Sequence, residues 1–235
     1  MSASLDRPWH ALPAVAVVAA LLSCAEAGPS VTVRLQLEAP EPADVEAPLR
    51  DALGLFNLEM WPLFVALSVE GPGMEPIGDQ WPQSAEDWQT GSTEVEFTLE
   101  VPAGKSRTVT AVAYRWSGGK THCYIPNPPE TVLDLDAETP ASLDLVLAES
   151  TYGTAAVELP AGISELWLVD ADALVRLDRK TPIEAFVKFG RVPLGRSMRL
   201  ATVDSDGKTV LLDGEPFLLS SSAPDVSIDL TAGAR

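Results

Sequence analysis

The sequence is poor in the residue types that carry most enzyme chemistry and most charge-driven binding. Its 235 residues include only two cysteines and two histidines, so a disulfide framework is excluded. Only 16 lysines and arginines oppose 34 aspartates and glutamates, and the net charge of −18 excludes simple attraction to phosphate backbones. With 46% hydrophobic residues, the chain is too apolar for a disordered acidic tail. We therefore expect one or two packed domains, with no nucleic-acid partner and no cofactor.

The first residues carry a targeting signal. An apolar run extends from Ala11 to Leu22 and is interrupted only by Pro13. This run is too short to cross a bilayer, which needs about 20 helical residues, but it fits the apolar segment of a secretory signal. We therefore predict a cleaved signal peptide over residues 1–23.

The run ends in Leu21-Leu22-Ser23-Cys24, which resembles the lipobox of bacterial lipoproteins. In that family the cysteine receives a diacylglycerol, the signal is cut before it, and the new amine is acylated. The resemblance implies that Cys24 is the lipid-attachment residue and that acyl chains anchor the protein in a lipid bilayer. Because Ala25-Glu26 supplies no aspartate after the cysteine, the resemblance also implies the outer membrane of the cell envelope. We predict that residues 24–30 form a short tether between the lipid and the first domain. The alternative is an ordinary cleaved signal in which Cys24 is incidental.

Beyond the tether, the dominant pattern is the alternation of apolar and polar residues, which predicts half-buried β-strands. Residues 31–38 alternate throughout, and 95–101, 132–135, 143–147 and 226–230 repeat the pattern. Twenty prolines, together with glycines, interrupt these runs at short intervals, as in antiparallel sandwiches. The pattern predicts an all-β fold of two tandem antiparallel β-sandwich domains after a cleaved signal peptide.

A single helix is predicted, from Pro48 to Phe56. Leu49, Ala52 and Leu53 would share one face of this helix with Phe56. Pro48 would occupy the first turn, where its missing N–H costs nothing. One short helix does not change the predicted class.

The chain also repeats itself. Val101-Pro102-Ala103-Gly104-Lys105-Ser106 matches Val192-Pro193-Leu194-Gly195-Arg196-Ser197, and an alternating strand follows each block. These strands lead into Gly118-Gly119 and Asp206-Gly207, the residues that tight hairpins require. The collinear blocks predict an internal duplication, although two unrelated sandwiches that share turn chemistry would also produce them. A further matching pair closes the halves: Ser142-Leu143-Asp144-Leu145 and Ser227-Ile228-Asp229-Leu230.

The segment from Phe189 through Val192-Pro193-Leu194-Gly195, with the strand that follows, is similar to transthyretin-like or carboxypeptidase-regulatory-like β-sandwich modules. The resemblance covers the latter part of each repeat. The aromatic residue that this family places after the glycine is replaced by Ser106 and Ser197. The resemblance implies noncatalytic spacers or sugar- and protein-binding units.

We predict a first domain over residues 31–149 and a second over residues 153–235, each long enough for its own core. Within the first domain, residues 71–92 show no periodicity and are predicted to form a long loop rich in tryptophan and proline. Long loops in compact domains are usually functional or disordered.

The long loop carries the candidate ligand contacts Met74, Trp81 and Trp88. The tryptophans could stack on a sugar or on an aromatic residue of a partner. The favoured alternative is that they fold back as a lid over the sandwich, because tryptophan supplies much buried area.

Catalytic residue types are scarce after the signal. His122 is the one histidine of the mature chain, and it adjoins Cys123. Neighbours on a strand point to opposite faces, so we predict a buried thiol and a surface imidazole, with no catalytic residue. Carboxylates occur at outward strand positions: Glu94, Glu96, Glu100, Asp134, Asp136 and Asp144.

If these acidic strands are neighbours, six carboxylates share one face, as in a cation site or a glycosidase. We favour a solvated face that protects sheet edges, and predict no metal site. The sequence therefore favours a noncatalytic, membrane-anchored envelope lipoprotein that is a structural or ligand-binding module, with a glycan or envelope protein as partner. The alternatives are a carboxylate-based glycan hydrolase and a calcium-dependent adhesive module.

Overall fold

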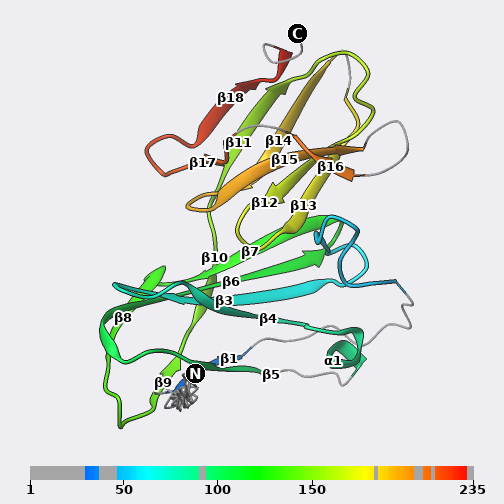
Figure 1. The fold of residues 1–235 in the computed structure, drawn as a ribbon. Coiled ribbons are helices and arrows are strands. Elements are labelled where there is room, and N and C mark those ends of the chain that lie inside the picture. The colour runs from blue at the N-terminus through cyan, green and yellow to red at the C-terminus, as the bar shows by residue number, and fades with distance from the viewer. Residues whose placement is uncertain are drawn as a thin grey trace, which may run out of the picture.

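The protein is built almost entirely from β-strands. The computed structural model describes residues 30–36, 47–89, 94–182, 185–203, 209–212 and 215–231. Within these ranges there are eighteen strands and one short helix, which confirms the predicted all-β sandwich class. Cys24 and the predicted Asp206-Gly207 turn lie outside the described residues. Figure 1 shows two sandwiches, with one end of the second lying over the face of the large sheet of the first.

The first sandwich packs a small sheet against a large one. The small sheet has the order β5 (Glu94–Glu100), β1 (Ser30–Gln36), β9 (Ala141–Asp144). The large sheet has the order β10 (Leu147–Glu149), β7 (Lys120–Pro126), β6 (Gly104–Ser117), β3 (Leu63–Glu70), β4 (Ile77–Trp81), and β8 (Glu130–Leu135) also pairs with β6.

The second sandwich has the same plan. Its small sheet has the order β14 (Phe186–Pro193), β11 (Tyr152–Glu158), β18 (Asp225–Asp229). Its large sheet has the order β16 (Thr209–Leu211), β15 (Ser197–Val203), β12 (Leu166–Asp170), β13 (Val175–Lys180), β2 (Phe56–Asn57), and β17 (Phe217–Leu218) also pairs with β15.

The strand pairing of one sandwich repeats in the other. In each small sheet the central strand runs antiparallel to one neighbour and parallel to the other, β9 in the first sandwich and β18 in the second, so one pair per small sheet is parallel. The agreement extends to single bonds: Leu145 N–H donates to Arg34 O at 3.3 Å, and Leu230 N–H donates to Glu158 O at 3.0 Å. Leu145 and Leu230 are the last residues of the matching sequence blocks, so the blocks occupy equivalent places in the two sandwiches.

The predicted alternation decides which side chains are buried. In β1, Val31, Val33 and Leu35 are fully buried, whereas Thr32 and Arg34 are not. The same inward-facing apolar residues continue through both sandwiches in a single cluster. Burial of these side chains is the main stabilising contribution to the fold, at about 25 cal/mol per Å² of apolar surface.

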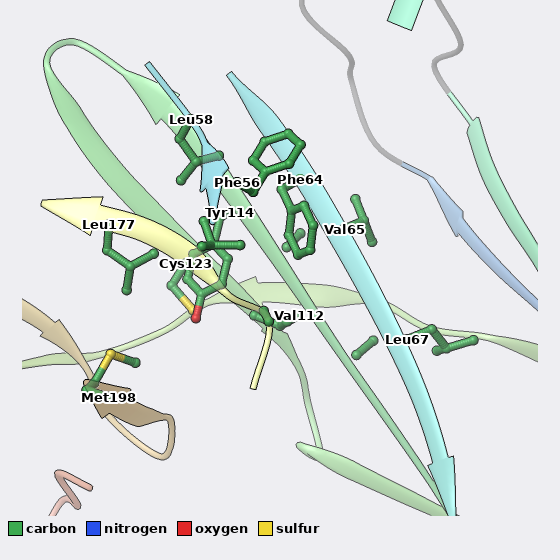
Figure 2. Close-up of a cluster of buried hydrophobic side chains, with 14 of the residues drawn as sticks. Phe56, Leu58, Phe64, Val65, Leu67, Val112, Tyr114, Cys123, Leu177 and Met198 are labelled. Carbon is green, nitrogen blue, oxygen red and sulfur yellow. The ribbon is translucent and has the colours of Figure 1, made fainter. Parts of the chain in front are cut away.

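The core continues across the junction between the sandwiches. Figure 2 shows Tyr114 and Cys123 of the first sandwich with Leu177 and Met198 of the second, and all four belong to the same buried cluster. The junction is therefore an apolar interface, and the two sandwiches share buried surface.

Residues 48–56 do not form the predicted helix. The carboxylate of Asp51 accepts hydrogen bonds from the N–H groups of Leu53 and Leu55 at 2.8 and 3.0 Å, and Gly54 has a φ of 76°. These are turn features, in which the side chain replaces helical backbone bonds. The segment then enters β2, which pairs with β13 of the second sandwich. Its apolar residues cover the second sandwich instead, where Leu55 packs with Trp167, Val169 and Ala201.

The stretch predicted as a loop, residues 71–92, contains regular structure. It includes β4 and a five-residue helix, α1 (Ala85–Gln89). The backbone N–H of Asp87 donates to Ser84 Oγ at 3.4 Å, and the Asp87 carboxylate accepts from the Ser84 N–H at 2.9 Å. This reciprocal cap starts α1 and is the reason a short helix forms here.

Candidate binding groove between the two sandwiches

A buried charged cluster joins the sandwiches. Asp170, at the end of β12, is fully buried, and Arg196 donates to it from Nε at 2.9 Å and from Nη2 at 3.1 Å. The hydroxyl of Tyr114, from β6 of the first sandwich, donates to the same carboxylate. The N–H groups of Asp172 and Ala173 add bonds of 2.9 and 2.7 Å. Because every partner is hydrogen-bonded, the pair is tolerated in the interior and fixes how the sandwiches dock.

The protonation states in this cluster follow from burial and charge. Burial lowers the pKa of Arg196, but Asp170 and Tyr114, through charge and hydrogen bonding, together outweigh burial, and the pKa of Arg196 is raised overall. Burial, and then the Asp170 charge, raise the pKa of Tyr114 well above its usual range, so the phenol stays a donor. Burial also raises the pKa of Cys123 to about 12. A thiol in this state is no nucleophile at neutral pH.

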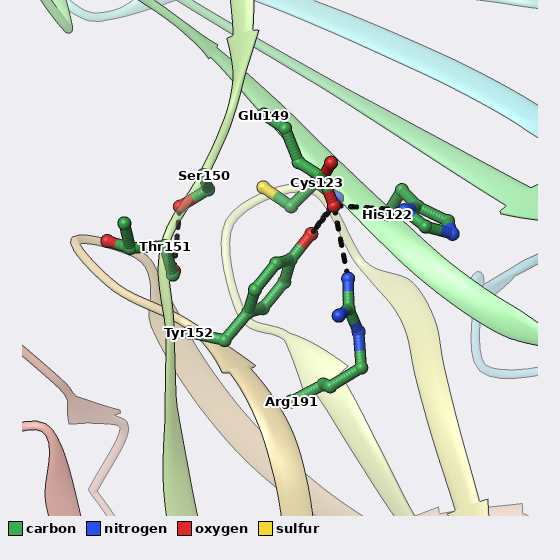
Figure 3. A network of polar contacts seen from close by, with 7 residues as sticks. All are labelled: His122, Cys123, Glu149, Ser150, Thr151, Tyr152 and Arg191. Carbon is green, nitrogen blue, oxygen red and sulfur yellow. Dashed lines mark hydrogen bonds and ion pairs between the residues drawn. The ribbon is translucent and has the colours of Figure 1, made fainter.

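A second polar network lies where the chain passes between the sandwiches. Glu149 Oε1 lies 2.9 Å from His122 Nδ1 and accepts hydrogen bonds of 3.2 Å from the Tyr152 hydroxyl and from Arg191 Nη2 (Figure 3). The hydrogen bond from His122 lowers the pKa of Glu149. The Arg191 guanidinium stacks on Tyr152, 3.9 Å from the ring centroid. His122, Tyr152 and Arg191, from three strands, thus all contact the Glu149 carboxylate. These contacts hold the crossing segment, residues 149–152, in place.

An open groove of about 1480 Å³ lies beside the charged cluster. One wall is the outer face of the large sheet of the first sandwich, with Ala66, Ser68, Gly78, Thr110 and Val112. The other wall is made by turns of the second sandwich, with Asp172, Leu174, Arg196, Leu194 and Ser220. The groove exists because the second sandwich covers only part of that sheet face.

The residues of the sheet wall are set by strand register. Ser68 of β3 is paired with Gly78 of β4 and with Thr110 of β6, and Thr110 is paired with Glu130 of β8. Paired residues project from the same face of a sheet, so these side chains form one row across the wall. Small side chains in this row leave the sheet surface flat and accessible.

The predicted contacts Met74, Trp81 and Trp88 do not line the groove. Trp88 is only 2% exposed and packs edge-on against Trp61 and in a stack against Trp81, with centroids 5.9 and 5.3 Å away. Met74 and Trp81 are partly buried against the same core. This geometry favours the lid alternative, in which the tryptophans close one end of the first sandwich.

The other candidate residues are found as follows. Cys123 is fully buried and His122 is partly exposed, which confirms the prediction of opposite faces. The face of six carboxylates is not formed: β5 pairs with β1 in the small sheet, whereas β8, with Asp134, pairs with β6 in the large sheet. Glu96 is paired with Arg34 at 2.8 Å. Among the described residues, no group of three or more His, Cys, Asp or Glu could hold a metal ion.

Sequence reasoning missed the residues that build the groove. Asp170 ends an apolar run of β12 and reads as the polar end of a strand. The usable signal is the repeat, because Arg196 stands where the first half has Lys105, and a guanidinium suits a bidentate buried pair better than an ammonium does.

No protein-family model and no curated protein sequence matches the chain. Among solved structures, a candidate polysaccharide-binding protein from Bacteroides thetaiotaomicron is 12% identical, with 77% of this chain and 78% of that chain covered and a TM-score of 0.28. A candidate cell adhesion protein from Bacteroides fragilis is 8% identical, with 85% and 91% covered and a TM-score of 0.28. A variant of the major pilin from Streptococcus pyogenes is 12% identical, with 86% and 97% covered and a TM-score of 0.21. Scores this low assign no function, and the architecture above rests on strand pairing alone.

The helix found in the described part of the chain, α1, has five residues, and no helix in that part has the length and hydrophobicity that a bilayer crossing requires.

Proposed function

We propose that this protein is a noncatalytic, lipid-anchored module of the cell envelope that binds a ligand in the groove between its two sandwiches. The observation that carries the proposal is the groove itself, formed by two sandwiches that the buried Asp170–Arg196–Tyr114 cluster joins. A preformed groove of this kind is a common form of binding site.

We propose the anchor from the sequence. Cys24 would receive the lipid, and the tether of residues 24–30 would lead directly into β1. In Figure 1, β1 lies in the sheet most distant from the second sandwich. An anchor at this end would therefore hold the first sandwich near the bilayer and leave the groove further out, within reach of a glycan or an envelope protein.

We also propose two modules, residues 31–149 and 153–235. The repeated strand plan supports this division, and the crossing segment around Glu149 and Tyr152 lies between them. Residues 56–57 are the exception, because β2 adds to a sheet of the second sandwich. The modules are thus interlocked as well as joined.

The anchor is tested by labelling with a clickable palmitate analogue. The wild-type chain should incorporate the label and fractionate with outer membranes, and Cys24→Ala should lose both properties. A labelled Cys24→Ala protein, or an unlabelled wild type, would contradict the anchor.

The groove is tested separately with glycan and peptide arrays, probed with the full chain in a non-ionic detergent. Ser68→Trp places a large side chain in the groove without a change in charge and should remove the array binding signals. The matched control is Thr98→Trp, an exposed residue of the small sheet. Signals that survive Ser68→Trp would show that binding occurs elsewhere.

A further inference from the structure

The sheet wall of the groove carries two exposed glutamates without ion-pair partners in the described part of the chain. Glu70 ends β3 and Glu130 begins β8; both are exposed and both line the groove. No salt bridge joins either of them to any cation in the described ranges. They are available to a partner.

The cations of the groove are already engaged. Arg196 is bound to Asp170, and Arg50 donates to the carbonyl of Leu174 at 3.1 Å and to the side chain of Gln80. The free charge that the groove presents is therefore negative, in a protein of net charge −18. Charge complementarity selects a cationic occupant.

The side chains of the sheet wall indicate which class of ligand the groove can accept. Ala66, Ser68, Gly78 and Thr110 are small and lie flat, and the one aromatic residue of the groove lining, Phe64, is fully buried. Tryptophan or tyrosine faces, on which sugar rings stack, are absent from this lining. A second copy of the chain would bring the same negative charge and be repelled. An extended peptide, with small side chains against the wall, fits this surface.

The spacing of the carboxylates sets the spacing of the partner's charges. Glu70 is paired with Thr108, and Glu130 with Thr110, on opposite sides of β6. Two strand spacings across the sheet and a two-residue offset along it place the two Cα atoms about 12 Å apart. Side chains four residues apart on an extended chain project to one face at a similar distance, about 13 Å.

We infer that the groove binds an extended cationic peptide segment whose lysine or arginine residues, four apart, contact Glu70 and Glu130. This inference rests on the proposed function, because it names the occupant of the same groove. The pairs are solvent-exposed, so binding is moderate in strength and decreases with salt.

The test uses the full chain in a non-ionic detergent and fluorescent peptides rich in serine and threonine. The probe has two lysines four residues apart; in one control they are three apart, which puts them on opposite faces of an extended chain, and in another they are glutamines. The probe should bind more tightly than either control by fluorescence anisotropy. Its affinity should fall when ionic strength is raised from about 0.05 to 0.5 M.

Glu70→Gln with Glu130→Gln should weaken probe binding about threefold to tenfold, since each exposed pair contributes little. Ser68→Trp should abolish it. Glu158→Gln, an exposed carboxylate of β11 outside the groove, is the matched control and should leave binding unchanged.

The outcomes separate this inference from the function on which it rests. One outcome is that neutral oligosaccharides bind, that Ser68→Trp prevents their binding, and that the three peptides bind equally. In that case the groove is a binding site, but the inference of a cationic peptide ligand is wrong. If no array component and no peptide responds to Ser68→Trp, both proposals fail. Equal binding of the lysine spacings, or insensitivity to Glu70→Gln with Glu130→Gln, overturns the inference alone.

Discussion

The two sandwiches contain the same sequence block, Val101–Ser106 leading into β6 in one and Val192–Ser197 leading into β15 in the other, but the blocks have different surroundings. Lys105 in the first block, at the start of β6, is exposed to solvent. Its counterpart in the repeat, Arg196, points into the junction and binds the buried Asp170. The block that meets another sandwich thus carries a forked cation paired with a buried carboxylate of β12, whereas the block that meets water does not. The repeat supplies a basic residue at this position, and the neighbouring sandwich determines what that residue does.

Two residues further along the repeat, the buried arginine is in the first sandwich and the second sandwich has an apolar residue. Met198 in the second sandwich is fully buried in the apolar junction, while its counterpart Arg107 is buried and pairs with no carboxylate among the residues that the structure describes. Arg107 donates instead to the carbonyls of Pro72, Pro102 and Ala103, at 2.8, 3.2 and 2.9 Å. A buried guanidinium can therefore be satisfied by backbone carbonyls as well as by a carboxylate, and each sandwich uses one of the two solutions.

The largest loss of stability is expected when the carboxylate that binds Arg196 is removed. Asp170→Ala leaves the buried Arg196 without a counter-charge and the Tyr114 hydroxyl without its acceptor. Breaking a buried pair in this way costs about 3–5 kcal/mol of unfolding free energy. Asp172→Ala is the control, because Asp172 is largely exposed and lies 3.6 Å from Arg196; its loss should cost under about 1 kcal/mol. Denaturant titration measures both, and equal losses would disprove the special role of Asp170.

The small sheet of the second sandwich allows a sharper test of backbone contact. A Cβ on Gly153 would lie 1.9 Å from the carbonyl oxygen of Pro224, so Gly153→Ala forces strands β11 and β18 apart. We expect a loss of about 2–3 kcal/mol, as for overpacking of a core. Gly190→Ala in β14 meets nothing within 4 Å and should be close to neutral. A neutral Gly153→Ala would contradict the parallel pairing in this sheet.

The junction should also respond to alkali. Burial raises the pKa of Cys123 from 9.0 to about 12, so the unfolded chain loses this proton first. Stability contributed by the neutral thiol is complete below pH 9 and is lost as pH rises towards 12, by about 1.4 kcal/mol per pH unit. The raised pKa of Tyr114 acts with the same sign.

Denaturant titrations at several pH values test this dependence. The slope between pH 9 and 11 should be smaller in Cys123→Ala than in the wild type, and smaller again when Tyr114→Phe is added. Parallel slopes in the three proteins would show that the junction is accessible to solvent.

The smallest loss of stability is expected when the residue of one sandwich is placed at the matching position of the other. Arg107→Met places the residue of the second sandwich in the first, and leaves three carbonyls without their donor. The lost hydrogen bonds should lower the unfolding free energy by about 1–2 kcal/mol. This loss is small because the substitution also removes the buried charge. Lys105→Met, at an exposed position of the same strand, should change the unfolding free energy by less than about 0.5 kcal/mol. A more stable Arg107→Met would mean that the carbonyls are hydrated.

The sequence predicted the strands that alternate clearly and missed the elements that depend on individual side chains. Val31 to Leu35 alternate, and Gly118 and Gly119 have the positive φ values that their hairpin requires. The predicted helix over 48–56 is wrong because Asp51 bonds its own backbone and Gly54 turns the chain. Neither contact is visible in a hydrophobic pattern.

The candidate groove was beyond prediction for a related reason. Asp170 and Tyr114 are 56 residues apart and meet only because one sandwich docks on the other. Periodicity describes which face of a strand is buried, but not which other strand buries it. Trp88 shows the same limit, because its spacing could not separate a surface contact from a side chain that is 2% exposed.

The most direct test of the account is differential scanning calorimetry of the full chain in a non-ionic detergent. Since the sandwiches share one core and a buried ion pair, the wild type should unfold in a single transition with equal calorimetric and van't Hoff enthalpies, and Asp170→Ala should divide it into two. Two separate transitions in the wild type would show that the sandwiches are independent and that no fixed groove lies between them.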